Sequence, residues 1–194
     1  MVSPKIIGVL SLQGDFLEHI QTLQRLNIKA KEVKLPKDLE DIDGIILPGG
    51  ESTTQACLLD VFKLREPLKQ KIKNGLPAWG TCAGMILLAK KLVQDRPIPL
   101  GLINIIVNRN AFGRQIESFQ VPLKIKLFDG NKPILATFIR APLITEIDPD
   151  VEILSTLEDG TIVVAQQKNI LVSSFHTELT TDTRLHEYFF SHII

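Results

Sequence analysis

The segment Gly80-Thr81-Cys82-Ala83-Gly84 decides the fold of this chain, because it joins an extended apolar run to a helical one. Residues 77–81 are typical of a short buried strand, and the apolar residues 83–92 predict a compact helix. The two glycines allow the sharp turn of a G-x-nucleophile-x-G elbow, here with cysteine at its centre. Open α/β sheets place their sites at the carboxyl ends of the strands, so the segment predicts an α/β fold with Cys82 at that edge.

Strand and helix patterns alternate on the N-terminal side of this elbow. The expected strands are 6–12, 30–35, 44–47 and 77–81, and the expected helices are 16–26, 52–60, 61–74 and 83–92. Such alternation favours a mostly parallel sheet with helices on both faces. Ser52, Thr53 and Thr54 are the expected cap residues of the second helix.

The C-terminal half of the chain is richer in strand patterns. The runs that read as extended are 103–107, 121–127, 134–139, 151–156, 161–166 and 170–174. Asp159-Gly160 indicates a hairpin between two of them, and a last helix is expected over 183–192. Since no repeat, low-complexity stretch or linker interrupts the chain, we expect one domain over residues 1–194.

Composition excludes several classes of function. Lys+Arg and Asp+Glu both number 22, so no excess of charge favours nucleic acid or an anionic membrane. The two cysteines, Cys57 and Cys82, are too few for a disulfide scaffold, which favours a reduced, cytoplasmic setting. The short apolar run near the N-terminus ends at Gln13, so we expect neither a signal peptide nor a membrane span.

Cys82 is the candidate nucleophile. The N-terminus of the following helix favours a thiolate, and the backbone N–H of Ala83 is placed to face a developing oxyanion. The alternative is a buried structural cysteine at a tight turn. Cys57 lies among apolar residues on an expected helix, so we expect it to be an inert core cysteine.

A thiol nucleophile needs a base, and His176 is the best candidate. It follows an apolar strand, and Glu178 two residues later points the same way in extended backbone. Glu178 is therefore expected to orient the imidazole as the third member of a triad. The alternative is an ordinary histidine at a strand end. The other histidines, His19, His186 and His192, are expected at the surface.

A glycine-rich turn and two arginines complete the candidate set. Gly49-Gly50-Glu51 follows an apolar strand, where the glycines permit close backbone approach and Glu51 could meet a substrate ammonium group. Arg109 and Arg140 each end a strand pattern and suit a carboxylate ligand, although most exposed arginines are merely solvated. No phosphate-loop or dinucleotide motif and no metal-ligand spacing is present, so we expect no cofactor and no metal.

These segments resemble the glutaminase subunits of pyridoxal 5'-phosphate synthase, which are triad-type (class I) glutamine amidotransferases. The elbow and the His-x-Glu pair are common to triad glutaminases, whereas two further strings are specific to this family. Those strings are Arg109-Asn110-Ala111-Phe112-Gly113-Arg114-Gln115 and Phe138-Ile139-Arg140-Ala141-Pro142. The resemblance extends over nearly the whole chain and implies a three-layer α/β/α sandwich around a mostly parallel mixed sheet.

The resemblance also implies residue roles. Cys82, His176 and Glu178 would form the catalytic triad. The positions that match glutamine-binding residues of the family are Gly50, Glu51, Ser52, Arg109, Ile139 and Arg140. Gly49 and Ala83 would supply the oxyanion site, and Gln13 matches a residue at the interface with the synthase. Thr177 departs from the family, which usually has proline between the histidine and the glutamate.

A reaction and a partner follow from the resemblance. L-Glutamine would be hydrolysed to L-glutamate through a γ-glutamyl thioester, and the ammonia would pass to a (β/α)8-barrel synthase subunit that makes pyridoxal 5'-phosphate (vitamin B6). Two rival hypotheses use the same residues differently. One is another cysteine hydrolase on a similar fold, such as a peptidase or a deglycase-like protein, and the other is a non-catalytic subunit that stabilises the synthase.

Overall fold

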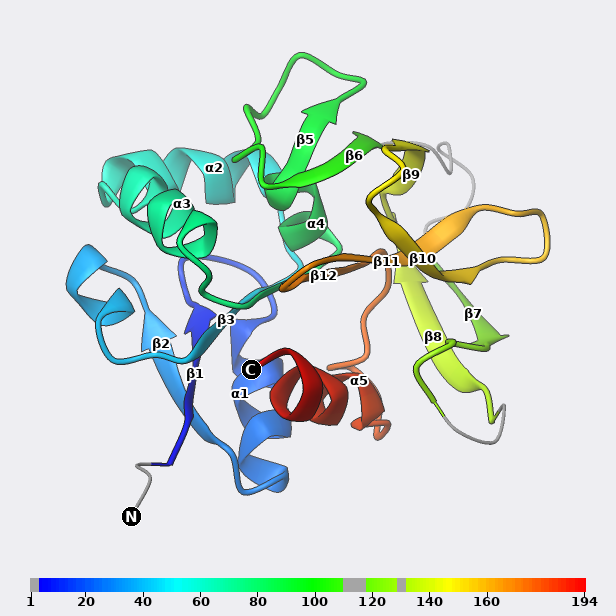
Figure 1. The fold of residues 1–194 in the computed structure, drawn as a ribbon, viewed down its shortest axis with the longest axis horizontal. Helices are drawn as coiled ribbons and strands as arrows, with labels where there is room; N and C mark the ends of the chain where they lie inside the picture. The colour runs from blue at the N-terminus through cyan, green and yellow to red at the C-terminus, as the bar shows by residue number, and fades with distance from the viewer. Residues whose placement is uncertain (1–3, 110–117, 129–131) are drawn as a thin grey trace.

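A twisted mixed sheet runs through the middle of the molecule, and helices cover both of its faces (Figure 1). The computed structural model describes residues 4–109, 118–128 and 132–194. Along the main path the strands are ordered β2-β1-β3-β4-β12-β11-β9-β6-β5. Their bounds are β1 Ile6–Leu10, β2 Lys29–Val33, β3 Gly44–Leu47, β4 Ala78–Thr81, β5 Ala89–Leu92, β6 Ile103–Asn108, β9 Leu143–Ile147, β11 Ile162–Gln167 and β12 Ile170–Ser173.

The strands that carry the site are parallel neighbours. β3 pairs with β4, and β4 pairs with β12, so the carboxyl ends of these three strands lie side by side. The register sets Ser173 opposite Thr81, and the Cys82 amide donates to the Ser173 carbonyl at 2.8 Å. β12 belongs to the C-terminal part of the sequence, yet it lies beside the elbow strand because its apolar residues need a buried place.

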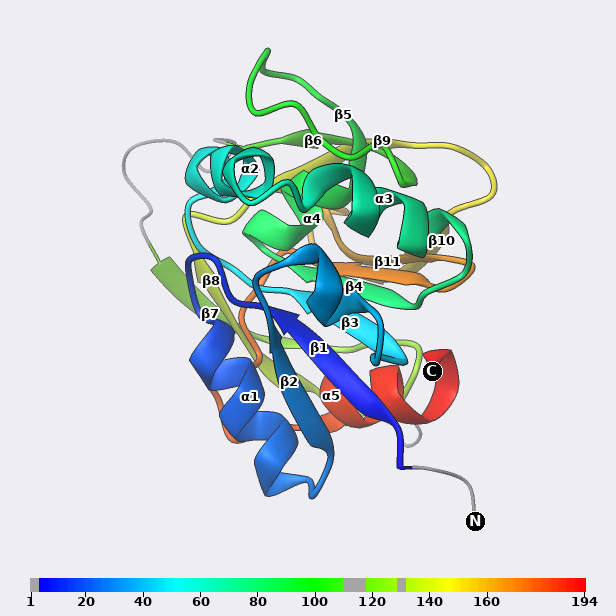
Figure 2. The same cartoon turned by 90° about the vertical axis from the view of Figure 1, so that its left-hand side faces the viewer.

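Two helical layers enclose the sheet (Figure 2). One layer holds α1 (Phe16–Arg25) and α5 (Arg184–Tyr188), which continues as a π-helix over Phe189–Ile193. The other holds α2 (Ser52–Val61), α3 (Arg65–Lys73) and α4 (Ala83–Leu88). The expected three-layer α/β/α fold is therefore confirmed.

Strand β3 shows how one short segment serves both layers. Ile45 and Leu47 belong to the core beneath α2, α3 and α4, whereas Ile46 between them belongs to the core beneath α1 and α5. All three side chains are fully buried. Because successive side chains of a strand point to opposite faces, an unbroken apolar run fits a strand covered on both sides. Burial of each such side chain stabilises the fold by about 1.5–3 kcal/mol.

The second half of the sheet is largely antiparallel. β9 pairs antiparallel with β6 and β11, and β10 (Glu152–Thr156) forms a hairpin with β11. The turn contains Gly160 at a φ of 86°, which confirms the hairpin expected at Asp159-Gly160. A separate two-stranded sheet, β7 (Ser118–Leu123) with β8 (Ile134–Ile139), is attached to the main fold through an isolated bridge from Thr137 to His176.

Several expected elements differ from the structure. The helix expected over 83–92 ends at Leu88, and β5 replaces its second part by pairing with β6. The helix expected over 61–74 starts later, at Arg65. The preceding α2 extends to Val61, and Lys63 separates the two helices with a φ of 54°. The expected strand 121–127 is shifted to β7, and β9 was not predicted. In each case strand pairing or a local turn overrides the apolar pattern, which does not distinguish short helices from short strands.

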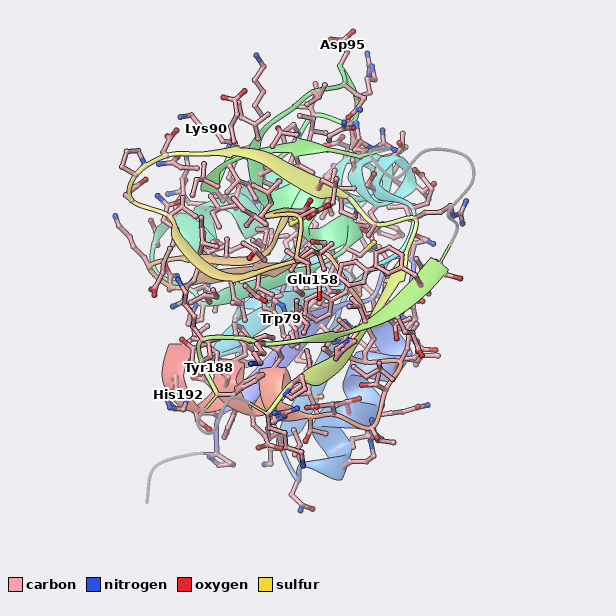
Figure 3. The ribbon with its side chains drawn as sticks, turned by 90° about the vertical axis from the view of Figure 1, so that its right-hand side faces the viewer. Trp79, Lys90, Asp95, Glu158, Tyr188 and His192 are labelled. Atoms are coloured by element: carbon pink, nitrogen blue, oxygen red, sulfur yellow. The ribbon has the colours of Figure 1, made fainter. Side chains whose placement is uncertain are left out.

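Two surface features complete the fold. Cys57 is exposed, so the prediction of a core cysteine is wrong: it lies on the solvent side of α2, whereas Ala56 and Leu59 are buried. His192 is exposed as expected and stacks on Tyr188 with ring centroids 4.9 Å apart (Figure 3). Within the described ranges no helix combines the length and apolarity needed to cross a bilayer.

Candidate active site

The elbow at Cys82 has the strained backbone that its motif predicts. Cys82 adopts a φ of 47° and a ψ of −103°, an unusual conformation for a residue with a side chain. The glycines on either side leave no room for a methyl group. A Cβ on Gly84 would lie 1.9 Å from the Leu47 carbonyl oxygen, and one on Gly80 would lie 2.5 Å from the Gly84 backbone. The tight packing of β3, β4 and α4 therefore fixes the position of the sulfur.

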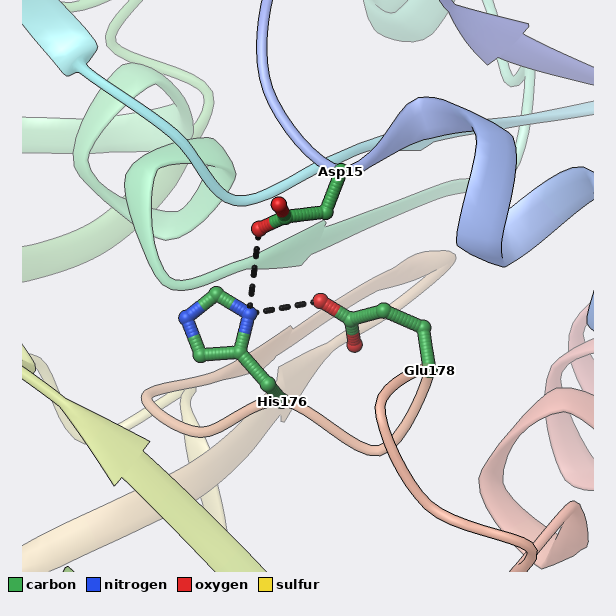
Figure 4. A group of neighbouring side chains, drawn as sticks. All are labelled: Asp15, His176 and Glu178. Atoms are coloured by element: carbon green, nitrogen blue, oxygen red, sulfur yellow. Dashed lines mark hydrogen bonds and ion pairs between the residues drawn. The ribbon is translucent and has the colours of Figure 1, made fainter. Parts of the chain in front are cut away.

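His176 lies beside the elbow and is held from two directions. Its amide donates to the Thr137 carbonyl at 2.9 Å, so the β7–β8 sheet anchors its backbone. Its Nδ1 hydrogen-bonds Glu178 Oε1 at 2.6 Å (Figure 4). Both residues are almost completely buried, with 3% and 4% of their surface exposed. The expected pairing of His176 with Glu178 is therefore confirmed, although Thr177 and Glu178 lie in a bend and a turn and not in the extended backbone that was expected.

The electrostatics of this pair favour a protonated imidazole. Burial lowers the pKa of His176, but hydrogen bonds to Cys82 and Glu178 and the charges of both groups outweigh it and raise the pKa to about 11. Burial raises the pKa of Glu178, and its hydrogen bond with His176 opposes that rise. At neutral pH the arrangement supports an imidazolium between a sulfur atom and a carboxyl group.

Asp15 is a second carboxyl group beside His176, and the sequence patterns did not single it out. Its Oδ2 lies 3.4 Å from His176 Nδ1 (Figure 4). Asp15 is the N-cap residue of α1, yet its side chain makes no capping hydrogen bond. An aspartate directly before a helix normally predicts a cap, which conceals this contact at the level of sequence.

Asp15, His176 and Glu178 also group three possible metal-ligand atoms within 4.8 Å of one another. His176 Nδ1 and Glu178 Oε1 already bond to each other, and both residues are buried. The hydrogen bond and the opposite charges of these groups account for the cluster without an ion.

A cleft of about 410 Å³ opens above the sulfur. Its lining is Gln13, Asp15, Gly50, Glu51, Ser52, Cys82, Ile86, Arg109, Ile139, Arg140, His176 and Leu179. Nine of the residues named from the sequence therefore meet in one cavity, although they come from six separate segments of the chain. Ile86 and Leu179 were not predicted, because apolar residues beside a turn look like ordinary core.

Gly49 and Ala83 take positions next to the cleft. Ala83 is the first residue of α4, directly after Cys82. Gly49 packs against the imidazole, since a Cβ there would lie 2.3 Å from His176 Cε1. Its carbonyl accepts from the Asp15 amide at 3.2 Å, and Gln13 Oε1 accepts from the Glu51 amide at 2.8 Å. The first turn of the chain and the glycine-rich turn thus hold each other in place.

Glu51 uses its carboxylate differently from the expectation for this position. It is the N-cap of α2, and its oxygens accept from the amides of Thr53 at 3.1 Å and Thr54 at 2.6 Å. The cap residue is therefore Glu51, and the prediction of Ser52, Thr53 or Thr54 as the cap is wrong. Partial burial raises the pKa of Glu51, but these hydrogen bonds outweigh it and lower the pKa to about 2. The charge remains at the rim of the cleft.

The two arginines at the rim of the cleft differ in their exposure and in their contacts. Arg109 Nη2 donates to Thr53 Oγ1 at 3.1 Å and lies 3.4 Å from Glu51 Oε1, while Nη1 donates to the Arg96 carbonyl. Arg140 is exposed and has a φ of 42°, directly after β8. Contacts within the chain thus hold the Arg109 guanidinium in place. The Arg140 backbone, directly after β8, adopts a sparsely populated conformation.

The chain matches known proteins over nearly its full length. Residues 9–194 match the SNO glutamine amidotransferase family. This chain belongs to that family. A relative from Carboxydothermus hydrogenoformans named "Pyridoxal 5'-phosphate synthase subunit PdxT" is 52% identical over 94% of this chain and 95% of its own length. A relative of the same name from Fervidobacterium nodosum is 52% identical, with 95% of each chain covered.

Solved structures agree with the family assignment. A crystal structure of a glutamine amidotransferase is 44% identical, superimposes with a TM-score of 0.87, and covers 94% of this chain and 96% of its own. The structure of PurLQS from Thermotoga maritima, at 16% identity, has a TM-score of 0.74 and covers 98% of this chain and 99% of that one. The second likeness extends to the fold alone.

Membership of the glutamine amidotransferase family agrees with the elbow, the His-x-Glu pair and the F-I-R-A-P string at the end of β8. Residues 110–115 of the other specific string lie outside the described residues.

The positions of two histidines contradict the predictions made for them. His19 and His186 are fully buried rather than at the surface. His19 lies 3.6 Å from Glu178, and His186 contacts His19. Their helices look solvated because charged neighbours dominate the local sequence.

Proposed function

We propose that this chain is the glutaminase subunit of a pyridoxal 5'-phosphate synthase, with residues 1–194 forming one catalytic domain. One observation carries the proposal: Glu178, His176 and Cys82 follow one another by hydrogen bonds at the base of a cleft with two arginines on its rim. A nucleophile, a general acid–base and an orienting carboxylate in this order are the machinery of acyl transfer. The family and the relatives supply glutamine as the acyl donor.

Acylation begins when the Cys82 thiolate attacks the side-chain carbonyl of glutamine. The carbonyl oxygen takes up negative charge, which the Ala83 N–H and an N–H of the Gly49-Gly50 turn would stabilise. His176, as an imidazolium, gives its proton to the departing nitrogen. The carbon–nitrogen bond breaks, ammonia leaves, and the γ-glutamyl group remains on sulfur as a thioester.

Deacylation reverses the proton traffic. Neutral His176 takes a proton from water, the hydroxide attacks the thioester carbonyl, and the carbon–sulfur bond breaks. Glutamate and the thiolate–imidazolium pair are the products. Glu178 stays ionised throughout and holds the imidazole in one orientation, because its Oε1 bonds Nδ1 at 2.6 Å. Thr177 is 2% exposed, so the turn between the two residues is fixed by packing even without proline.

The rim would select the amino-acid end of the substrate. Arg109 and Arg140 would bind the α-carboxylate, with Ile139 beneath the aliphatic chain. Gly50, Glu51 and Ser52, next to Arg109, would also contact the amino-acid end. Since the Glu51 carboxylate already caps α2, its charge would attract the substrate ammonium group while backbone atoms of the turn make the closer contacts.

A partner is part of the proposal. Ammonia at neutral pH is mostly protonated and then a poor nucleophile, so a synthase gains from receiving it through a closed path. We propose a (β/α)8-barrel synthase subunit as the recipient, with Gln13 at the interface, and the cytoplasm as the site of the reaction. The relatives named as subunits of pyridoxal 5'-phosphate synthase support such an assembly.

Glutamate release from L-glutamine, measured with and without the synthase subunit, tests this function. We expect release that rises when the synthase is added, that disappears in Cys82→Ala, and that is accompanied by pyridoxal 5'-phosphate. Small amides and peptides should be hydrolysed far more slowly than glutamine. A protein that binds the synthase but releases no glutamate under any condition would be a docking subunit, and preference for peptides would indicate a peptidase.

A further inference from the structure

A row of buried polar groups continues behind the triad, away from the cleft. Glu178 Oε1 bonds His176, and its Oε2 is turned away from that bond (Figure 4). Oε2 is buried and makes no hydrogen bond within the described ranges 4–109, 118–128 and 132–194. His19 Nε2 lies 3.6 Å from it, with both side chains completely buried. Burying a carboxylate oxygen without a hydrogen-bond donor costs free energy of folding, and the His19 imidazole is the neighbouring group that can supply a donor.

His19 is itself held on three sides. Its Nδ1 lies 2.9 Å from His186 Nε2, and its Nε2 lies 3.2 Å from Thr81 Oγ1. The Trp79 ring meets both imidazoles edge-on, at centroid distances of 5.6 Å from His19 and 4.8 Å from His186. The row therefore links α1, α5 and β4, and Thr81 is the residue directly before the nucleophile.

The imidazoles of His19 and His186 are both neutral and share one hydrogen bond. Burial, followed by the charges of His186 and His176, lowers the pKa of His19 well below its ordinary value. Burial and then Arg25 lower the pKa of His186 to about 3. Both rings are therefore neutral at physiological pH. One proton lies between them, and either ring could donate it.

The two tautomers differ in what they present to Glu178. If His19 donated through Nδ1, its Nε2 lone pair would face the carboxylate, and the unpartnered Nδ1 of His186 would be a buried N–H. If His186 donates instead, the His19 Nε2–H points toward Thr81 and Glu178, and His186 Nδ1 is left with only a lone pair. The second arrangement places a hydrogen next to the carboxylate charge and leaves no buried donor unpaired.

We propose that His19 is a positioning residue of the active site, whose Nε2–H supports the Glu178 carboxylate and whose tautomer is fixed by His186. The triad thus extends to Glu178–His19–His186. This inference rests on the proposed glutaminase function for its kinetic consequence, whereas its structural consequence concerns His176 and Glu178 in the free protein. The ionisable groups that face Glu178 are His176, Asp15 and His19. Those that face His19 are His186, His176 and Glu178, and Arg25 acts on His186.

Two substitutions at one position separate donation from packing. His19→Gln keeps an N–H near the place of Nε2, whereas His19→Asn ends short of it. We expect His19→Asn to lower kcat for glutamine hydrolysis in the synthase complex about tenfold, with KM unchanged. The acid limb of its kcat/KM profile should move to higher pH, because a less supported Glu178 carboxylate is protonated earlier. His19→Gln should restore most of both, and His192→Gln, at an exposed histidine, should resemble the wild type.

NMR of nitrogen-labelled histidine in the free protein measures the imidazole N–H signals, and this measurement does not depend on activity. His19→Asn should shift the His176 Nδ1–H signal, and His19→Gln should return it toward the wild-type position. If His19→Asn does not fold, His186→Leu removes the donor that fixes the tautomer and should shift the same signal.

An unchanged His176 signal and an unchanged acid limb in a folded variant would show that His19 only packs, and would overturn the proposal. Failure of the wild-type complex to hydrolyse glutamine would overturn the proposed function instead. In that case the NMR comparison still decides whether His19 supports Glu178.

Discussion

The inner wall of the cleft, formed by Cys82, His176 and Glu178, is at most 6% exposed, whereas the Glu51 side chain at the rim is 52% exposed. On the wall, burial holds each polar atom in one position, and the hydrogen bonds and charges of Cys82 and Glu178 outweigh the effect of burial and raise the pKa of His176 to about 11. The rim also includes Arg109 and Arg140. There Glu51 and Arg140 are exposed, while the Arg109 guanidinium contacts Glu51 and Thr53 of the neighbouring helix start. Interactions at the wall are therefore expected to control the rate of reaction, and those at the rim to control affinity.

The largest effect is expected at the centre of the wall. Cys82→Ala should reduce glutamate release in the synthase complex by at least about a thousandfold, because no other group can form the thioester. Cys57→Ala is the matched control, since that sulfur is exposed on α2 and distant in sequence from the elbow. Equal loss in both variants would mean that general damage, and not the nucleophile, explains the result.

A smaller loss is expected at Glu178. Glu178→Gln should lower kcat by about a hundredfold or more, because the amide cannot stabilise the imidazolium that forms on His176. Asp15→Asn removes the other carboxylate near Nδ1, which lies at 3.4 Å compared with 2.6 Å for Glu178. Its kcat should fall much less. The reverse ranking would identify Asp15 as the orienting group.

At the rim we expect an effect on KM. Arg109→Ala should raise KM for glutamine about tenfold or more while changing kcat little, since it removes a charge-assisted contact with the substrate carboxylate. Arg109→Lys keeps the charge but loses the two-pronged geometry, so its KM should fall between those of the wild type and Arg109→Ala. Steady-state kinetics in the complex measures both. A fall in kcat at constant KM would contradict this role and show that Arg109 acts on the rate of reaction, as the residues of the wall are expected to do.

The smallest effect is expected at Glu51. Glu51→Gln should destabilise the protein by about 1 kcal/mol or less, because the amide is a weaker cap for α2 and the site is partly exposed. The Glu51 pKa is lowered from 4.5 to about 2, so its contribution is present above pH 4.5 and is lost as the pH falls toward 2.

Chemical denaturation at several pH values measures this contribution. The stability difference between the wild type and Glu51→Gln should shrink below pH 4.5. Glu66→Gln is the control, since Glu66 occupies the first turn of α3 and no side-chain capping bond is present there. A difference that stays constant down to pH 2 would contradict the capping role.

The sequence patterns located the site better than they located the elements. The strand that ends at Leu47 was predicted with correct bounds, because two glycines stop it sharply, while the helix begun at Ala83 was extended four residues too far into β5. Lys90 and Lys91 do not interrupt a helical pattern, and only pairing with β6 reveals the strand. The prediction that Cys57 is buried is wrong for a related reason, since apolar neighbours in sequence do not decide which side of a helix is buried.

The sequence alone identified the proposed reacting groups, because the motifs that indicate them are local. The elbow must place a side chain between two glycines, and a histidine two residues before a glutamate keeps the two side chains within reach of each other. Tertiary structure decided which charges are buried. Nothing in the sequence of α1 distinguishes His19 from a solvated histidine, yet the packing of α1 and α5 beneath β4 sets it 3.6 Å from Glu178. Burial depends on which distant surfaces meet, and the strength of each interaction in the triad depends on burial.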